Sequence, residues 1–266
     1  MDDPRHGRAY ASADRPILWR RLIAELAGSM FLTALVVGSG IAAQRLSPGQ
    51  PGLELLENAA ATAAGLFAII LMFGPVSGGH FNPVVSFADA ALGGISWRDA
   101  AVYLPAQVAG CCGGAILANV MFAVPAVSIS GKDRATAPHF LAEVVATLGL
   151  VALIFALGRA GRMQVIPAAV GAYIGAAYFF TSSASFANPA ITIGRMLSDT
   201  FAGIAPSSVP LFIAAQVTGG ALAVALVRTL YPRPGQAAPV TTSEPGGSAA
   251  TANGSSPSPD HTTPVS

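Results

Sequence analysis

The chain has 266 residues, of which 53% are apolar and only 10% are charged, and its formal net charge is +1. A soluble domain carries about 25% charged residues, so this composition excludes an ordinary water-facing surface. The near-neutral chain has no cluster of basic residues, and we expect no nucleic acid partner. The composition therefore indicates an integral membrane protein embedded in a lipid bilayer.

Apolar segments of two lengths follow one another along the chain. A helix that crosses a bilayer needs about 20 apolar residues. The predicted spans are 18–43, 58–73, 97–123, 140–157, 165–180 and 206–230. Two further pieces, 82–92 and 188–196, are too short to cross, and the segment 47–57 is expected to be a loop. The pattern predicts an all-α membrane protein with six transmembrane helices and two re-entrant half-helices.

The domain organisation follows from changes in composition. Residues 1–16 are polar and contain arginine, and residues 232–266 are rich in Pro, Gly, Ser and Thr. Neither segment can bury a core, so both are expected to be disordered. Residues 17–231 form the predicted channel domain, with repeat halves at about 17–123 and 138–231.

Three landmarks recur in the same order in the two halves. They are Glu25 and Glu143, Asn82-Pro83 and Asn188-Pro189, and Ala106-Gln107 and Ala215-Gln216. Three echoes at similar spacing indicate an internal duplication. Because each half holds three spans, an odd number, the halves must lie with opposite orientation in the membrane. Many transport proteins are built on such inverted repeats, with functional sites at the repeat interface.

Basic residues predict the orientation. With the N-terminus inside, ten basic residues lie in inner segments and four in outer ones. The inner residues are Arg5, Arg8, Arg15, Arg20, Arg21, Arg98, Arg159, Arg162, Arg228 and Arg233, and the outer ones are Arg45, Lys132, Arg134 and Arg195. The excess of Lys and Arg on cytoplasmic loops predicts a multi-pass protein of the plasma (inner) membrane with both termini cytoplasmic.

The two Asn-Pro dipeptides are start signals for the short helices. Asn is a preferred N-cap and Pro suits the first helical position. The half-helices are expected to enter from opposite faces and to point their positive dipole ends at the midplane, which opposes cations. The amides of Asn82 and Asn188, with the backbone carbonyls of 78–81 and 183–187, would then bind small neutral solutes. The alternative is that Asn-Pro only marks turns, and the recurrence in both halves disfavours it.

These motifs resemble a known family. The segment Ser77-Gly78-Gly79-His80-Phe81-Asn82-Pro83, with the later Asn188-Pro189-Ala190, resembles the signatures of the aquaporin (major intrinsic protein) family over about 20–231. The resemblance implies pore motifs at Asn82-Pro83-Val84 and Asn188-Pro189-Ala190, with Val84 replacing the usual alanine. It also implies a homotetramer in which each protomer holds its own pore.

The resemblance also assigns residues outside the pore motifs. Glu25 and Glu143 match the paired buried glutamates that support the re-entrant loops in the family. His80 resembles the family's loop histidine, for which we expect a structural role in that loop. The adjacent Cys111 and Cys112 are expected to pack as small residues, because neighbours on a helix do not share a face.

The position after the second motif departs from the family. Members usually place arginine there, where it narrows and charges the outer selectivity filter, and this chain has Ile191. Arg195, one turn further, is expected to reach over the outer mouth without occupying the usual site; the alternative is a charge in water or lipid headgroups. With spacing carried over from the family, the resemblance implies that the other filter positions are Thr62, Ser185 and either Tyr178 or Ala176. A filter without that cation should favour neutral solutes larger than water.

An aliphatic residue at this position, with Thr on the second span, resembles bacterial aquaglyceroporins associated with arsenic resistance. The expected function is passive passage of water and small neutral solutes, such as glycerol-like polyols or arsenite and other metalloid hydroxides, without ions. The alternatives are a water-selective aquaporin, a secondary transporter and a non-conducting membrane scaffold. The sequence shows no Ser-His-Asp, metal-ligand or phosphate-loop spacing, so no enzyme activity, metal or cofactor is expected.

Overall fold

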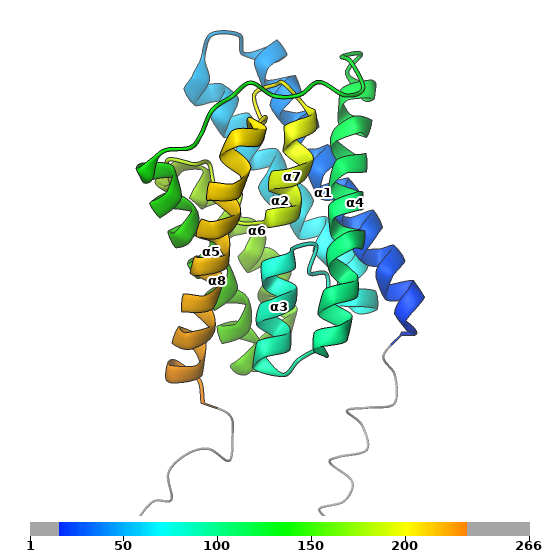
Figure 1. Cartoon of the computed structure of the whole chain (residues 1–266), viewed down its shortest axis with the longest axis vertical. Coiled ribbons are helices and arrows are strands. Elements are labelled where there is room, and N and C mark those ends of the chain that lie inside the picture. Colours follow the sequence, from blue (N-terminus) through cyan, green and yellow to red (C-terminus); the bar gives the residue numbers. More distant parts are fainter. Residues whose placement is uncertain (1–15, 233–266) are drawn as a thin grey trace, which may run out of the picture. The chain divides into compact units, whose positions relative to one another are not determined.

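The computed structural model describes residues 16–232, and these residues are helical with no strands (Figure 1). The elements in chain order are α1 (Leu18–Leu46), α2 (Pro51–Ser77), α3 (Pro83–Leu92), α4 (Trp97–Met121), α5 (Ala137–Arg159), η1 (Met163–Val165), α6 (Ile166–Phe180), α7 (Pro189–Gly194), η2 (Arg195–Leu197), η3 (Pro206–Ser208) and α8 (Val209–Leu230). In this part of the chain, six helical segments are long and apolar enough to cross a membrane. The predictions for 1–15 and 233–266 lie outside the described residues.

The start of α2 corrects one prediction. The segment 47–57 is not a loop throughout, because α2 begins at Pro51 and continues past Phe73 to Ser77. Proline is compatible with a helix start because the first amides of a helix have no intrahelical acceptor. Gly78 then ends the helix with a left-handed φ of 97°, a conformation that glycine adopts without a steric penalty.

The predicted short helices are α3 and α7, which Figure 1 shows as brief coils among the long helices. Each begins at an Asn-Pro pair, with proline at the first helical position. Asn82 Oδ1 accepts a hydrogen bond from the Val84 amide at 3.0 Å, and Asn188 Oδ1 accepts one from the Ala190 amide at 2.9 Å. The N-cap signal in the sequence therefore operates in both halves, and Asn188 Oδ1 also accepts from the Ile191 amide at 3.3 Å.

The repeat is also visible in how the long helices pack. Helix α1 packs on α4 in the first half, and α5 packs on α8 in the second. A Cβ added to Gly110 would collide with the Leu26 carbonyl, and one added to Gly219 would collide with the Val144 carbonyl. Small residues let helix backbones approach closely in lipid, so matched glycines set the helix separation in both halves.

Polar side chains are buried and apolar side chains are exposed, the reverse of the arrangement in a soluble protein. The polar side chains of Glu25, Gln107, Glu143 and Gln216 are completely buried, whereas many large apolar side chains are exposed. The exposed apolar surface fits contact with lipid, because lipid tails do not penalise it as water does. The buried polar groups instead position the two re-entrant segments.

Candidate functional site: a central cavity between the half-helices

A cavity of about 840 Å³ passes both Asn-Pro motifs, and its lining includes Asn82 and Asn188. We call it the central cavity. At the α3 end its wall includes His80 and Arg159, and beside α7 it includes Ser185 and Arg195. Apolar side chains from four long helices complete much of the wall: Leu32, Val36, Leu66, Ile70, Leu150, Val170 and Ile174. Polar groups thus come mainly from the re-entrant segments and apolar groups from the spans.

The two Asn-Pro motifs are joined by reciprocal hydrogen bonds. Asn82 Nδ2 donates to the Ala187 carbonyl, and Asn188 Nδ2 donates to the Phe81 carbonyl, both at 2.7 Å. Phe81 and Ala187 hold left-handed φ values of 50° and 48°, which are unusual for residues with a Cβ. Each asparagine amide has two N–H groups, so this mutual brace leaves one on each side chain. The brace holds the starts of the two half-helices together.

Glu25 binds the loop that precedes the first motif. One carboxylate oxygen accepts from Ser77 Oγ at 2.6 Å and from the His80 amide at 3.0 Å. The other accepts from the Phe81 amide and from Gln107 Nε2, both at 2.7 Å. The carboxylate is outside the lining of the central cavity and holds the backbone that leads into Asn82.

Glu143 repeats this arrangement in the second half. It accepts from the amides of Phe186 at 2.9 Å and Ala187 at 2.8 Å, and from Gln216 Nε2 at 2.7 Å. Gln216 also donates to Thr192 Oγ1 at 2.9 Å, and the equivalent bond in the first half joins Gln107 to Ser86 at 2.9 Å. In both halves, therefore, a glutamate accepts from two loop amides and from a glutamine, which also donates to a hydroxyl side chain of the half-helix.

We expect Asn188→Ala to destabilise the protein by about 1–3 kcal/mol, from the lost N-cap and the lost bond to the Phe81 carbonyl. The measurement is the thermal unfolding midpoint of detergent-purified protein. Thr229→Ala is the control, because that exposed hydroxyl bonds only to the Ala225 carbonyl of its own helix. A midpoint for Asn188→Ala equal to that of the control would contradict the brace.

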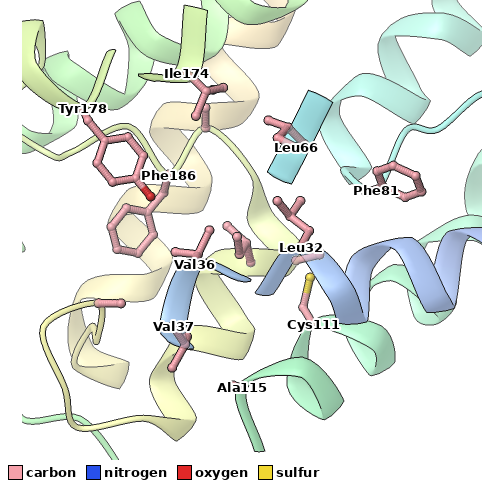
Figure 2. Close-up of a cluster of buried hydrophobic side chains, with 14 of the residues drawn as sticks. Leu32, Val36, Val37, Leu66, Phe81, Cys111, Ala115, Ile174, Tyr178 and Phe186 are labelled. Atoms are coloured by element: carbon pink, nitrogen blue, oxygen red, sulfur yellow. The ribbon is translucent and has the colours of Figure 1, made fainter. Parts of the chain in front are cut away.

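The predicted filter residues meet at the α7 end of the cavity. Thr62, Tyr178, Ser185 and Ile191 all line it, and the hydroxyls of Thr62 and Tyr178 lie 3.2 Å apart. Ser185 Oγ is buried and has no hydrogen-bond partner among the described residues. Of the two alternatives on α6, Tyr178 lies in the wall, whereas Ala176 is exposed on the outside of the protein. Figure 2 shows Tyr178 with Ile174 and Phe186 in one buried cluster.

The structure excludes one alternative for Arg195. Its side chain is only 3% exposed, so it is not a charge in water or lipid headgroups. It lines the cavity together with the four filter residues, so this end of the cavity has a cation although Ile191 stands at the usual arginine position. Its guanidinium carbon lies 3.4 Å from the centroid of the Phe186 ring. Phe186 was not predicted, because an apolar residue before a motif carries no signal of its contacts.

The remaining predicted residues lie around this pathway. His80 lines the cavity at the α3 end, where Nδ1 lies 3.0 Å from Ser86 Oγ and Nε2 lies 3.5 Å from Asp89. Val84 lies outside the cavity lining and fills the space beside Gly220 of α8, where a Cβ would collide with it. Cys111 is buried and Cys112 is partly buried, and neither lines the cavity.

Within residues 16–232, six apolar spans, two half-helices joined at their starts and a cavity past both define an inverted-repeat membrane channel fold. Residues 12–187 match the Major intrinsic protein family, and the chain belongs to this family. It is 46% identical over 213 residues to the aquaglyceroporin AqpS of Rhizobium meliloti (strain 1021), a match that covers 80% of this chain and 91% of AqpS.

Two further comparisons agree with this assignment. The chain is 28% identical over 230 residues to a probable aquaporin, TIP2-2, of Oryza sativa subsp. japonica, which covers 84% of this chain and 91% of that protein. The X-ray structure of the aquaglyceroporin from Plasmodium falciparum superimposes with a TM-score of 0.64 at 20% identity, covering 80% of this chain and 96% of that one. At this identity the structural likeness establishes the fold.

Proposed function

We propose that the protein is a passive channel for water and small neutral hydroxyl compounds, with glycerol-like polyols and arsenous acid among its solutes. The observation that carries the proposal is the central cavity, which passes both Asn-Pro motifs and ends among the hydroxyls of Thr62, Tyr178 and Ser185. Membership of the major intrinsic protein family and 46% identity to a protein named an aquaglyceroporin support it.

The proposed filter has two chemically different walls. Ser185 has a free hydroxyl, while Ile191 and Phe186 are apolar. A polyol has hydroxyl groups along one edge and carbon atoms along the other. As it passes the filter, it can therefore replace its contacts with water by contacts with both walls. Replacing each lost hydrogen bond to water is necessary because an unsatisfied buried polar group costs about 1–3 kcal/mol. Midway along, the remaining N–H of Asn82 and of Asn188 would donate to a solute oxygen.

The geometry disfavours a proton-coupled transporter. Such a mechanism needs an ionisable group that alternates in the pathway, and the candidates in the sequence were Glu25 and Glu143. Both carboxylates face the re-entrant loops and accept several hydrogen bonds there. Neither carboxylate lines the central cavity, so neither is placed to exchange protons with a passing solute. We also propose that the protein is a channel and not an enzyme.

We further propose that the protein lies in the plasma (inner) membrane with both termini cytoplasmic, so that the α7 end of the cavity faces outward. The excess of Lys and Arg on the segments assigned to the inside supports this orientation. The family resemblance supports a homotetramer with one pore per protomer.

Stopped-flow light scattering of proteoliposomes with water, glycerol and arsenous acid tests the proposal. We expect all three to permeate faster than through empty liposomes, with glycerol flux proportional to its gradient and independent of a proton gradient. Water passage alone would support a water-selective aquaporin instead. Saturable flux that needs a proton gradient would indicate a transporter, and permeabilities equal to those of empty liposomes would indicate a scaffold.

A further inference from the structure

We infer that Arg195 is the cation of the selectivity filter, supplied from one helical turn beyond the position where Ile191 stands. This inference rests on the proposed channel function. In this assignment Arg195 repels cations, and Ile191 is an apolar part of the cavity wall one helical turn away.

Helix geometry places both residues on the pathway. Residues four apart lie on the same face of a helix, separated along its axis by about 6 Å. Ile191 and Arg195 are so spaced, and both line the central cavity. An ideal Cβ on Gly194 would lie 2.7 Å from the carbonyl carbon and oxygen of Cys111. This close contact with α4 fixes the rotation of α7 about its axis, which keeps Ile191 and Arg195 turned toward the cavity.

The guanidinium of Arg195 is held by a stack and by a backbone bond. Its carbon lies 3.4 Å from the Phe186 ring centroid, and its Nε donates to the Ala202 carbonyl. On the same ring, the guanidinium carbon of Arg134 lies 5.3 Å from the centroid. Arginine favours aromatic faces because the planar cation meets the negative face of the ring. The side chain is therefore pre-positioned at the filter.

Three successive carbonyls anchor the cations at this end. Lys132 Nζ donates to the Phe201 carbonyl at 3.1 Å and Arg134 Nε donates to the Gly203 carbonyl at 3.0 Å, on either side of the Ala202 carbonyl used by Arg195. Between residues 16 and 232, no carboxylate lies within ion-pair distance of Arg134 or Arg195. Carbonyl dipoles orient these cations without cancelling their charge.

The positive charges of Arg134 and Arg195 also act on Lys132. Burial lowers the pKa of Lys132, and the positive charges of Arg134 and Arg195 lower it further. A cation that reaches the filter meets the repulsion of Arg195, which lines the cavity, in a region where water screens poorly. A neutral solute instead meets the remaining N–H donors of Arg195, since a guanidinium carries five, and the free hydroxyl of Ser185.

The test replaces the charge and measures ions and glycerol separately. In proteoliposomes we expect Arg195→Gln to raise the Na⁺ and proton leak at least about tenfold, the lower limit for clefts of one charge sign, while glycerol flux stays above that of empty liposomes because the glutamine amide still donates hydrogen bonds. Arg134→Gln is the matched control, since Arg134 stacks on the same ring but lies outside the cavity lining. Its leak should stay near wild type. Adding Ile191→Arg to Arg195→Gln should restore low leak by returning a cation to the wall.

Arg195→Lys provides a readout that a purely structural clamp would not change. We expect a low ion leak at neutral pH and a rising leak as the lysine loses its proton at alkaline pH. The wild type is measured at the same pH values, because Tyr178, Lys132 and Arg134 are titratable groups near the filter. This variant also carries the test if Arg195→Gln fails to fold. A wild-type leak in Arg195→Gln with glycerol flux intact, or a pH-independent leak in Arg195→Lys, overturns the inference and leaves the channel function standing. Absence of glycerol flux in the wild type overturns the channel function itself.

Discussion

Ile191→Arg is expected to lower glycerol and arsenous acid permeability at least about tenfold, and water permeability less. Ile191 is buried in the cavity wall one turn from Arg195, so the substitution adds both bulk and a second cation to the α7 end of the cavity. Excess bulk in a packed site costs about 1–3 kcal/mol, and each 1.4 kcal/mol of barrier is about a factor of ten in rate. Water is smaller than either solute, so it is less affected by the lost width.

The measurement is stopped-flow light scattering with the three solutes on matched amounts of reconstituted protein. Ile191→Met is the control, because it conserves volume and charge and should stay close to wild type for every solute. Equal losses for water, glycerol and arsenous acid would show a general blockage or misfolding and would contradict a role for Ile191 in solute selection.

Glu143→Ala is expected to cause the largest loss of stability. It removes the acceptor of two backbone amides and of Gln216 in a site without exposure to solvent. Each buried donor left unpaired costs about 1–3 kcal/mol, so the total is expected to be at least about 3 kcal/mol. The amides belong to Phe186 and Ala187, so the ring that supports Arg195 and the Asn82 brace both lose their anchor. Flux should fall together with stability.

The readout is the unfolding midpoint in detergent, together with glycerol flux of the fraction that remains folded. The unfolding midpoint of Glu143→Gln should be intermediate. Glutamine has one acceptor oxygen instead of two, and its NH₂ group would face the N–H donors that Glu143 accepts from. Glu57→Ala is the control: that carboxylate accepts from Ser47 Oγ at the edge of the fold and should cost about 1 kcal/mol or less. A Glu143→Ala midpoint as high as that of Glu57→Ala would show that the loop does not depend on the carboxylate.

Local signals in the sequence determined the helical plan of this protein. Long apolar runs define the spans because a bilayer imposes their length, and Asn82 and Asn188 begin the short helices because an N-cap acts on the amides next to it. The inverted repeat followed from residues recurring in order. The start of α2 at Pro51 was missed because the Pro-Gly-Glu composition there is also typical of loops.

Only the tertiary structure decided which residues line the cavity at its α7 end. Sequence spacing left Tyr178 and Ala176 as alternatives, and only the packing of α6 turns Tyr178 into the cavity. The position of Arg195 depends on α7 pressing Gly194 against α4 and on Phe186, which Glu143 holds from another helix. A charge at the filter can come from any residue whose side chain reaches it, because electrostatic repulsion depends on distance in space. The residue next to the motif in sequence therefore did not reveal the cation in the cavity wall.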